Sequence, residues 1–380
     1  MVSTPVEESD TMKISRRQFA RTAGAGLVFS PALVNAGLAE ALDLPAAAPL
    51  SETSKVALVH GDDRRKNVLE ALTRIDDQIK PALARRKTVA IKVNFVSDSI
   101  QLAATHIDAV RGILDYLQPR FHGPVMVVES SAQDTLNGFK NFHYEQLLEE
   151  RKTQKLSLVD LNREEDSHMV SMIDADLHIA QARLAARLLD PDTFVISSSM
   201  LKTHNSVVAT MSVKNMVLGA ALRSAPGQPL WSDKRKFHVG VRPMNLNMLI
   251  VAQKLRPQWG VAVIDGFEGM EGSGPTQGTP VDSRVAVAST DFVAADRVGL
   301  ELMGINPAWV GYLNYCGQSG VGQYDLSKIE VLGPPISSVQ KSFKLHPNIE
   351  RELKWMGPLP SNEQEIRVGH LDLPPEYIYG

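Results

Sequence analysis

Short apolar runs alternate with amphipathic stretches along most of this chain, and this alternation constrains its fold more than any other feature. Residues 88–95, 125–128 and 194–200 are the clearest apolar runs. Stretches with helical spacing of apolar residues, such as 107–117 and 244–255, lie between and after them. Strands that are apolar on both faces are typical of a parallel sheet with helices on each side. The pattern predicts a Rossmann-like α/β fold with mostly parallel strands covered by helices on both faces.

The same pattern predicts the organisation of the chain. Residues 42–54 are expected to be a linker, and 55–335 an α/β domain whose possible lobes are 55–190 and 191–335. Residues 336–380, rich in proline, charge and aromatics, are expected to wrap the surface. The other predicted strands are 56–59, 156–160, 261–264, 285–288 and 329–332, and the other predicted helices are 67–79 and 291–303.

The N-terminal residues predict export. Arg16 and Arg17 precede a mildly apolar stretch of small residues, with possible cleavage sites at 34–36 and 39–41. A twin-arginine pair in this context is typical of a bacterial Tat signal, here assigned to residues 1–41. We therefore expect the Tat translocase as a partner during export, and a periplasmic or exported location.

Composition excludes several classes of protein. The chain has 40 basic and 43 acidic residues and no basic run, so no nucleic-acid partner is expected. After the signal, no apolar segment is long enough for a stable membrane span. The single cysteine, Cys316, excludes an intrachain disulfide and an iron–sulfur cluster held by cysteines of this chain. It is expected to be a buried, inert thiol.

Polar side chains follow several of the predicted strands. Lys92 and Asn94 end one strand, Glu129 and Ser130 follow the next, and Lys202 follows the run 194–200. Because the carboxyl ends of parallel strands lie on one edge of a sheet, residues distant in sequence can converge there. The sequence therefore predicts a ligand site at this edge.

The segment after the run 194–200 carries the most chemistry. Lys202 and Lys214 are cations that can hold a carboxylate or phosphate. His204 is a group that can transfer a proton near neutral pH. Asn215 could orient a ligand or cap a turn. The residues expected to bind substrate or another anion are Lys92, Asn94, Glu129, Ser130, Lys202, Lys214, Asn215, Gly272 and Gly274.

A second segment, 264–278, combines acids with glycines. Its carboxylates, Asp265, Glu268 and Glu271, could bind a divalent cation through oxygen ligands. Alternatively, the N–H groups of Gly272 and Gly274 could hold an anion while a carboxylate acts as a base. A plain glycine-rich turn with solvated acids is a further alternative. The spacing matches neither a dinucleotide fingerprint nor a P-loop.

Five ordered motifs resemble the domain of unknown function 362 family, a largely uncharacterised group of bacterial and archaeal proteins. The resemblance covers about residues 55–335. Some relatives carry an appended ferredoxin-like cluster domain, which suggests redox work, but this chain lacks the cysteines for one. The family name implies no reaction. The motifs are 91–94, 128–130, 201–204 with Thr210, Lys214, Asn215 and Gly219, 265–266 with 270–275, and 288–296.

The spacing from His204 to Lys214 is also faintly similar to nickel-dependent lactate racemases. In that family a proton-transferring histidine precedes a lysine that carries a nickel pincer nucleotide. The similarity implies an acid/base role for His204 and a cofactor-anchoring or anion-holding role for Lys214. This chain departs from the family at Ser212 and Val213, which replace its glycine-arginine context, and at His238, which is not at the spacing of its second histidine.

Together these features predict an exported soluble enzyme of oxidoreductase or isomerase type that binds a small anionic substrate or cofactor. His204 would transfer a proton, and Lys202 and Lys214 would hold the anion. Asp265 and Glu271 would act as a counter-base or as cation ligands. A divalent metal or a nucleotide-type cofactor is compatible with this site. The alternative is a non-catalytic accessory protein that binds a cofactor or metabolite.

Overall fold

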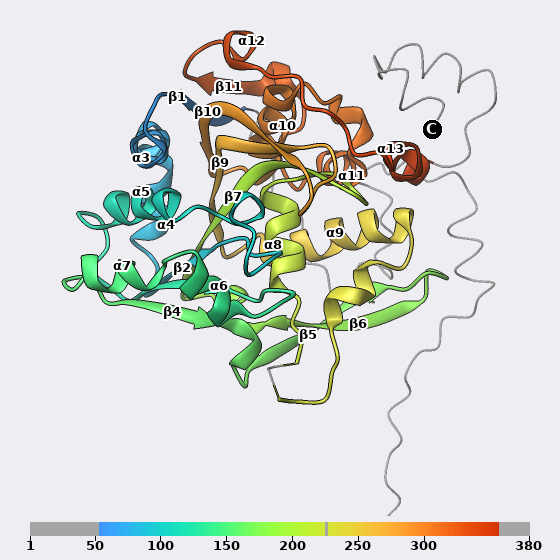
Figure 1. Ribbon diagram of the computed structural model, residues 1–380, viewed down its shortest axis with the longest axis horizontal. Coiled ribbons are helices and arrows are strands. Elements are labelled where there is room, and N and C mark those ends of the chain that lie inside the picture. Colours follow the sequence, from blue (N-terminus) through green and yellow to red (C-terminus); the bar gives the residue numbers. More distant parts are fainter. Residues whose placement is uncertain (1–52, 225–226, 357–380) are drawn as a thin grey trace, which may run out of the picture.

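The computed structural model describes residues 53–224 and 227–356, which form a nine-stranded sheet and a separate two-stranded hairpin (Figure 1). The predicted signal at 1–41 and nearly all of the predicted linker lie outside the described residues. The strands are β1 Ser54–His60, β2 Thr88–Lys92, β3 Val125–Glu129, β4 Leu156–Asp160, β5 Ser167–Ile173, β6 Ile179–Ala185, β7 Thr193–His204, β8 Val208–Thr210, β9 Trp259–Glu271, β10 Thr279–Ser289 and β11 Ile329–Leu332.

The main sheet is mostly parallel, which confirms the predicted fold class. Its order is β11-β1-β10-β9-β7-β2-β3-β4, and β8 pairs with β7 outside this path. Strands β4, β3, β2, β7 and β9 are parallel to their neighbours in this series, and β11 is parallel to β1. Only β10 runs antiparallel to both of its neighbours in the path, β9 and β1.

Helices cover both faces of this sheet. Alternate residues of β2 point to opposite sides: Val89 and Ile91 pack with α3 and α5, whereas Ala90 belongs to the core under α8 and α9. Figure 1 shows these two groups of helices on either side of the strands. The helices are α3 Arg64–Arg74, α4 Asp76–Leu83, α5 Ile107–Leu117, α6 Thr135–Asn141, α7 Glu145–Glu150, α8 Ser212–Ala220, α9 Val241–Leu255, α10 Phe292–Met303, α11 Gly311–Gln318, α12 Ile336–Val339 and α13 Ile349–Glu352.

Both predicted lobes contribute to the same sheet. Strand β1, from the range 55–190, lies between β10 and β11, which come from the range 191–335. Strand β7, from the second range, lies beside β2 from the first. Apart from the β5–β6 hairpin, the strands of 55–335 therefore share one sheet rather than forming one main sheet in each range.

Several predicted elements differ in extent from the observed ones, and three of these differences have a clear physical reason. The predicted helix 67–79 is two helices, because the chain turns at the fully buried Ile75, whose N–H donates to Leu72 O. The predicted strand 194–200 continues to His204 as β7, because β8 folds back and pairs with its end. The predicted strand 261–264 continues to Glu271 as β9, because it forms a long hairpin with β10.

Candidate functional site at the carboxyl edge of the sheet

The carboxyl edge of the parallel strands brings together the side chains that the sequence placed there. Lys92 ends β2, Glu129 ends β3 and Lys202 lies near the end of β7, and each is almost completely buried. Helix α8 packs over them and contributes Lys214 and Asn215. The predicted convergence of the residues from β2, β3, β7 and α8 is therefore present in the structure.

Lys92 and Glu129 form a buried ion pair whose hydrogen bonds are internal. Lys92 Nζ lies 2.8 Å from Glu129 Oε1 and also donates to Val93 O and to Asn215 Oδ1. Glu129 accepts hydrogen bonds from the backbone N–H groups of Phe95 and Ser130. Burial lowers the pKa of Lys92, and the Glu129 carboxylate opposes that shift. An ammonium group has three N–H bonds, so Lys92 has no donor left for a ligand.

The two asparagines connect this pair to Lys202. Asn94 Nδ2 donates to Asn215 Oδ1 at 3.1 Å, and Asn94 Oδ1 accepts from Lys202 Nζ at 2.8 Å. Lys202 Nζ also donates to Ala103 O at 2.8 Å. These bonds use two of the three N–H groups of Lys202 and leave one without an acceptor among the described residues. Asn94 and Asn215 therefore position Lys202 within the cluster.

Both ends of α8 are held by charged side chains. Asp296 accepts hydrogen bonds from Ser212 N and Val213 N, at 2.8 and 3.0 Å, and burial raises its pKa to about 7. Lys234 Nζ donates to Leu218 O and Ala221 O at the other end. These contacts satisfy backbone groups that a helix leaves unpaired at its ends.

Lys234 also donates to Ser130 Oγ at 2.9 Å, so all three of its N–H bonds have acceptors. Ser130 Oγ in turn donates to Gly219 O at 2.6 Å. Sequence reasoning missed Lys234, because nothing in the sequence distinguishes it from its two basic neighbours, Arg235 and Lys236.

Gly219 allows α8 to approach the ion pair closely. A Cβ atom at this position would lie 2.2 Å from Lys92 Nζ and 3.7 Å from Glu129 Oε1. Any other residue would therefore force the helix or the ammonium group to move. This close contact explains a glycine inside a buried helix, where glycine is otherwise unfavourable.

Lys214 differs from the other lysines of the cluster. It lies in the first turn of α8 and is only 5% exposed. Its Nζ forms no hydrogen bond or ion pair with any residue in the ranges 53–224 and 227–356. Burial lowers its pKa to about 7, and the positive charge of Lys92 adds to this effect. Lys214 thus combines burial, an unused set of donors and a labile proton.

His204 is buried as a neutral hydrogen-bond donor. Its Nδ1 accepts a hydrogen bond from Ser206 N at 3.1 Å, so the neutral ring carries its proton on Nε2. Burial lowers the pKa of His204 well below its ordinary value, and the positive charges of Lys214 and Lys202 lower it further. The ring is therefore uncharged at neutral pH and offers an N–H to a ligand oxygen. Because Nε2 already carries a proton, His204 cannot accept another proton there until it has donated the first.

The C-terminal segment holds the turn that follows His204. Glu352 Oε2 accepts a hydrogen bond from Val208 N at 2.6 Å, and its side chain is completely buried. Val208 has φ of 68°, an unfavourable value for a β-branched residue. Burial raises the pKa of Glu352 to about 8. Sequence reasoning did not identify Glu352, because its function depends on a contact with a residue 144 positions away.

The acids of 264–278 do not form the predicted cation site or counter-base. Asp265 pairs with Arg64 at 3.1 Å and accepts from Phe267 N, Glu268 is exposed, and Glu271 accepts from Lys344 N. Asp265 and Glu271 are thus held by different segments, the first by Arg64 and Phe267 N and the second by Lys344 N. Across the described ranges, no group of three or more His, Cys, Asp or Glu residues is arranged to hold a metal ion.

The predicted glycine anion cradle is also wrong. Gly272 N donates to Lys344 O at 2.8 Å, and Gly274 N donates to Gly272 O at 2.7 Å, so neither N–H is free for a ligand. A Cβ on Gly274 would lie 2.1 Å from Thr203 O. Gly274 therefore serves close packing of this loop against the end of β7.

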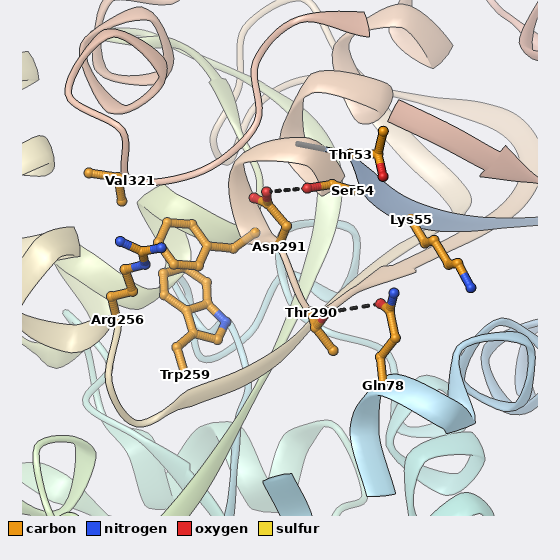
Figure 2. A pocket seen from close by; sticks show the side chains of 10 residues that line it. Thr53, Ser54, Lys55, Gln78, Arg256, Trp259, Thr290, Asp291 and Val321 are labelled. Atoms are coloured by element: carbon orange, nitrogen blue, oxygen red, sulfur yellow. Dashed lines mark hydrogen bonds between the residues drawn. The ribbon is translucent and has the colours of Figure 1, made fainter. Parts of the chain in front are cut away.

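A pocket of about 310 Å³ lies at the opposite, amino edge of the sheet (Figure 2). Trp259 at the start of β9 and Ser54 at the start of β1 line it, together with Asp291. Asp291 accepts a hydrogen bond from Ser54 Oγ and caps α10. The pocket contains none of the site residues that the sequence predicted.

Comparison with known proteins gives a family for this chain. The model of the family described as "Domain of unknown function (DUF362)" matches residues 89–301. The Thylakoid-associated protein sll1697 of Synechocystis sp. is 29% identical over 131 residues. The match covers 34% of this chain and 37% of that protein, so it spans little more than a third of the relative's length.

Two solved structures share parts of the arrangement. A Thermotoga maritima protein has a TM-score of 0.37 at 11% identity, covering 56% of this chain and 52% of that one. The lactate racemase apoprotein of Thermoanaerobacterium thermosaccharolyticum has a TM-score of 0.39 at 14% identity, covering 69% and 58%. These scores are low, and the match to the family model carries the assignment.

Proposed function

The chain belongs to the DUF362 family, and from this premise we propose that it is an enzyme that binds a small anionic substrate at Lys202, His204 and Lys214. The family gives no reaction, so the proposal rests on the chemistry of these three side chains. Among the described residues, Lys92 alone of the four clustered lysines has a carboxylate within ion-pair distance. Lys202, Lys214 and Lys234 are cations, or potential cations, without such a partner.

The unused hydrogen-bond donors carry this proposal. Among the residues that the structure describes, one N–H of Lys202, the amine of Lys214 and Nε2–H of His204 have no acceptor, whereas every N–H of Lys92 and Lys234 has one. An anion with several oxygens would satisfy these donors together and would offset the buried positive charge.

His204 has the properties of a group that stabilises a developing oxyanion. A neutral imidazole that donates through Nε2 can polarise a carbonyl without being protonated first. We propose that His204 acts in this way, or donates its Nε2 proton, in a reaction of isomerase or oxidoreductase type. Lys202 and Lys214 would hold the anionic group of the substrate.

Anion binding can be tested with oxalate, a small dicarboxylate, by isothermal titration calorimetry. We expect binding to the unmodified protein and a loss of roughly tenfold or more in affinity for Lys214→Met and for Lys202→Met. Lys66→Met is the matched control, because that side chain is 80% exposed and lies on α3. Equal affinities for all four proteins would contradict the assignment of this site.

The alternative, an accessory protein that holds a metabolite without chemistry, gives a different result with His204→Gln. An enzyme should lose turnover while keeping the ligand, once a substrate is found. An accessory protein should bind and release the same ligand unchanged. A turnover rate that is the same in His204→Gln and in the unmodified enzyme would remove His204 from the mechanism.

We further propose that residues 1–41 direct export through the Tat translocase. Arg16 and Arg17 support this assignment. No helix of the described ranges is long and apolar enough to cross a membrane. Changing Arg16 and Arg17 to lysine should leave the protein in the cytoplasmic fraction, and periplasmic recovery of that variant would contradict the proposal.

A further inference from the structure

Lys214 is the lysine of the buried cluster whose Nζ has no acceptor among the described residues, whereas the other three each donate at least two hydrogen bonds. Lys92 donates to Glu129, Val93 O and Asn215, and Lys234 donates to Ser130 Oγ and two carbonyl groups. Lys202 donates twice. Lys214 Nζ has no acceptor among the residues of 53–224 and 227–356, although it lies in the same cluster. Its lone pair and its N–H bonds are therefore not committed to the fold.

We infer that Lys214 is a nucleophilic amine that forms an imine with the ketone of a small 2-oxo acid. This inference rests on the proposed function, because the anion-holding donors would bring the carboxylate of the substrate to the cluster. We infer a ketone in the substrate from two groups. The amine of Lys214 can attack a carbonyl carbon, and the neutral Nε2–H of His204 can stabilise the carbonyl oxygen.

The surroundings of Lys214 favour the neutral amine that such a reaction needs. A lysine becomes a nucleophile when burial or a neighbouring cation lowers its pKa. Both causes act here and bring the pKa of Lys214 to about 7, the Lys92 ammonium being the neighbouring cation. The titratable and charged groups that act on Lys214 or feel its charge are Lys92, Glu129, Lys202, His204, Lys234 and His238.

The proposed step balances without an oxidant or a reductant. The lone pair of Lys214 Nζ forms a bond to the ketone carbon, and the electron pair of the C=O π bond moves to oxygen, which His204 Nε2–H stabilises. Nζ loses one proton and the oxygen gains one, giving a carbinolamine. Nζ then loses its second proton as the C–O bond breaks, so that one water leaves and a C=N bond remains.

The test is reductive trapping with pyruvate, which combines a ketone with a carboxylate, and sodium cyanoborohydride. Intact mass spectrometry should show one added reduced pyruvate per chain, and peptide mapping should place it on Lys214. Lys214→Arg keeps a cation but has no such amine, and it should give no adduct. The trapping rate should rise as pH increases through about 7 and then level off, because the neutral amine is the reactive form.

Oxalate separates this inference from the proposed function, because it is an anion without a ketone. If oxalate binds and pyruvate is not trapped, imine formation is wrong and anion binding stands. If neither interacts with the protein, both are wrong. An adduct on Lys202, on Lys234 or on surface lysines, or equal labelling of Lys214→Arg, would also overturn the inference. Circular dichroism should show that Lys214→Arg is folded.

Discussion

The region around α8 and the β9–β10 hairpin both carry charged residues, but among the described residues their charged groups differ in how far they are paired. In the hairpin, Asp265 has Arg64 and Phe267 N as donors, and Glu271 has Lys344 N. At α8, Glu129 pairs with only one of four lysines. On the proposed function, the open hydrogen bonds at α8 mark a binding site, whereas the closed ones of the hairpin serve stability.

Breaking the Lys92–Glu129 ion pair should give the largest effect on the free energy of unfolding. Glu129→Gln removes the only carboxylate that pairs with these lysines within residues 53–224 and 227–356, and it leaves Lys92 without a counter-charge in a fully buried position. Breaking a buried pair from one side costs about 3 to 5 kcal/mol. Urea denaturation should show a loss of this size. A change below about 1 kcal/mol would mean that the pair is not the centre of the cluster, and exposed Glu268→Gln is the control.

Glu352 should make stability depend on pH. Its pKa is raised to about 8 in the folded protein from an ordinary value of 4.5, so between these values the native state binds a proton that the unfolded chain does not. Its stabilising contribution is present below pH 4.5 and is lost as pH rises to about 8. Glu352→Gln stays neutral at every pH. Its loss of unfolding free energy over this pH range should therefore be smaller than that of the unmodified protein, by on the order of 3 kcal/mol.

Denaturation of the two proteins at pH 5 and pH 8.5 measures this difference directly. Asp296, whose pKa is also raised, is present in both proteins and therefore cancels in the comparison. Parallel pH profiles for Glu352→Gln and the unmodified protein would exclude a buried, protonated Glu352.

Gly219→Ala tests the close approach of α8 to Lys92. Alanine normally stabilises a helix by about 1 kcal/mol relative to glycine. Here its Cβ would lie 2.2 Å from Lys92 Nζ, so we expect a net loss of about 1 to 3 kcal/mol in urea denaturation. The loss should shrink in a Lys92→Met background. Stabilisation by Gly219→Ala alone would show that the helix is not held against the lysine.

Substitution of the hairpin residue Glu271 should have the smallest effect on the free energy of unfolding. The Glu271 side chain is 15% exposed and accepts one backbone hydrogen bond, from Lys344 N. Glu271→Gln keeps an acceptor oxygen, so the expected change in unfolding free energy is about 1 kcal/mol or less. Oxalate affinity should not change. A tenfold loss of oxalate affinity would show that Glu271 belongs to the binding site.

The sequence predicted the sheet and the convergence of polar side chains at its carboxyl edge, for a physical reason. The apolar runs of β2, β3 and β7 have to be buried on both faces, and this requirement fixes a parallel sheet whose carboxyl ends share an edge. Lys92, Glu129 and Lys202 follow these runs directly. The predicted polar edge therefore depended on local patterns alone.

The sequence could not distinguish the roles of the residues within that edge. Lys92 and Lys214 are both lysines, and only their three-dimensional neighbours distinguish them. Every N–H of Lys92 has an acceptor, whereas Lys214 Nζ has none among the described residues. The extension of β7 through Lys202 and His204 depends on β8, which is only three residues long. The acids of β9 looked like a turn because glycines surround them, but pairing with β10 extends that segment.

The central claim, that open buried ammonium groups bind an anion, is tested most directly by counting protons during binding. The pKa of the free Lys214 is about 7, so at pH 8 it is mostly neutral, and a bound anion favours its ammonium form. Calorimetric titration with oxalate at pH 8, in buffers of different ionisation enthalpy, should show uptake approaching roughly one proton. Lys214→Met should show less uptake, the remainder coming from Lys202, whose pKa burial also lowers well below its ordinary value. Binding without proton uptake, or the same uptake in Lys214→Met, would contradict the account.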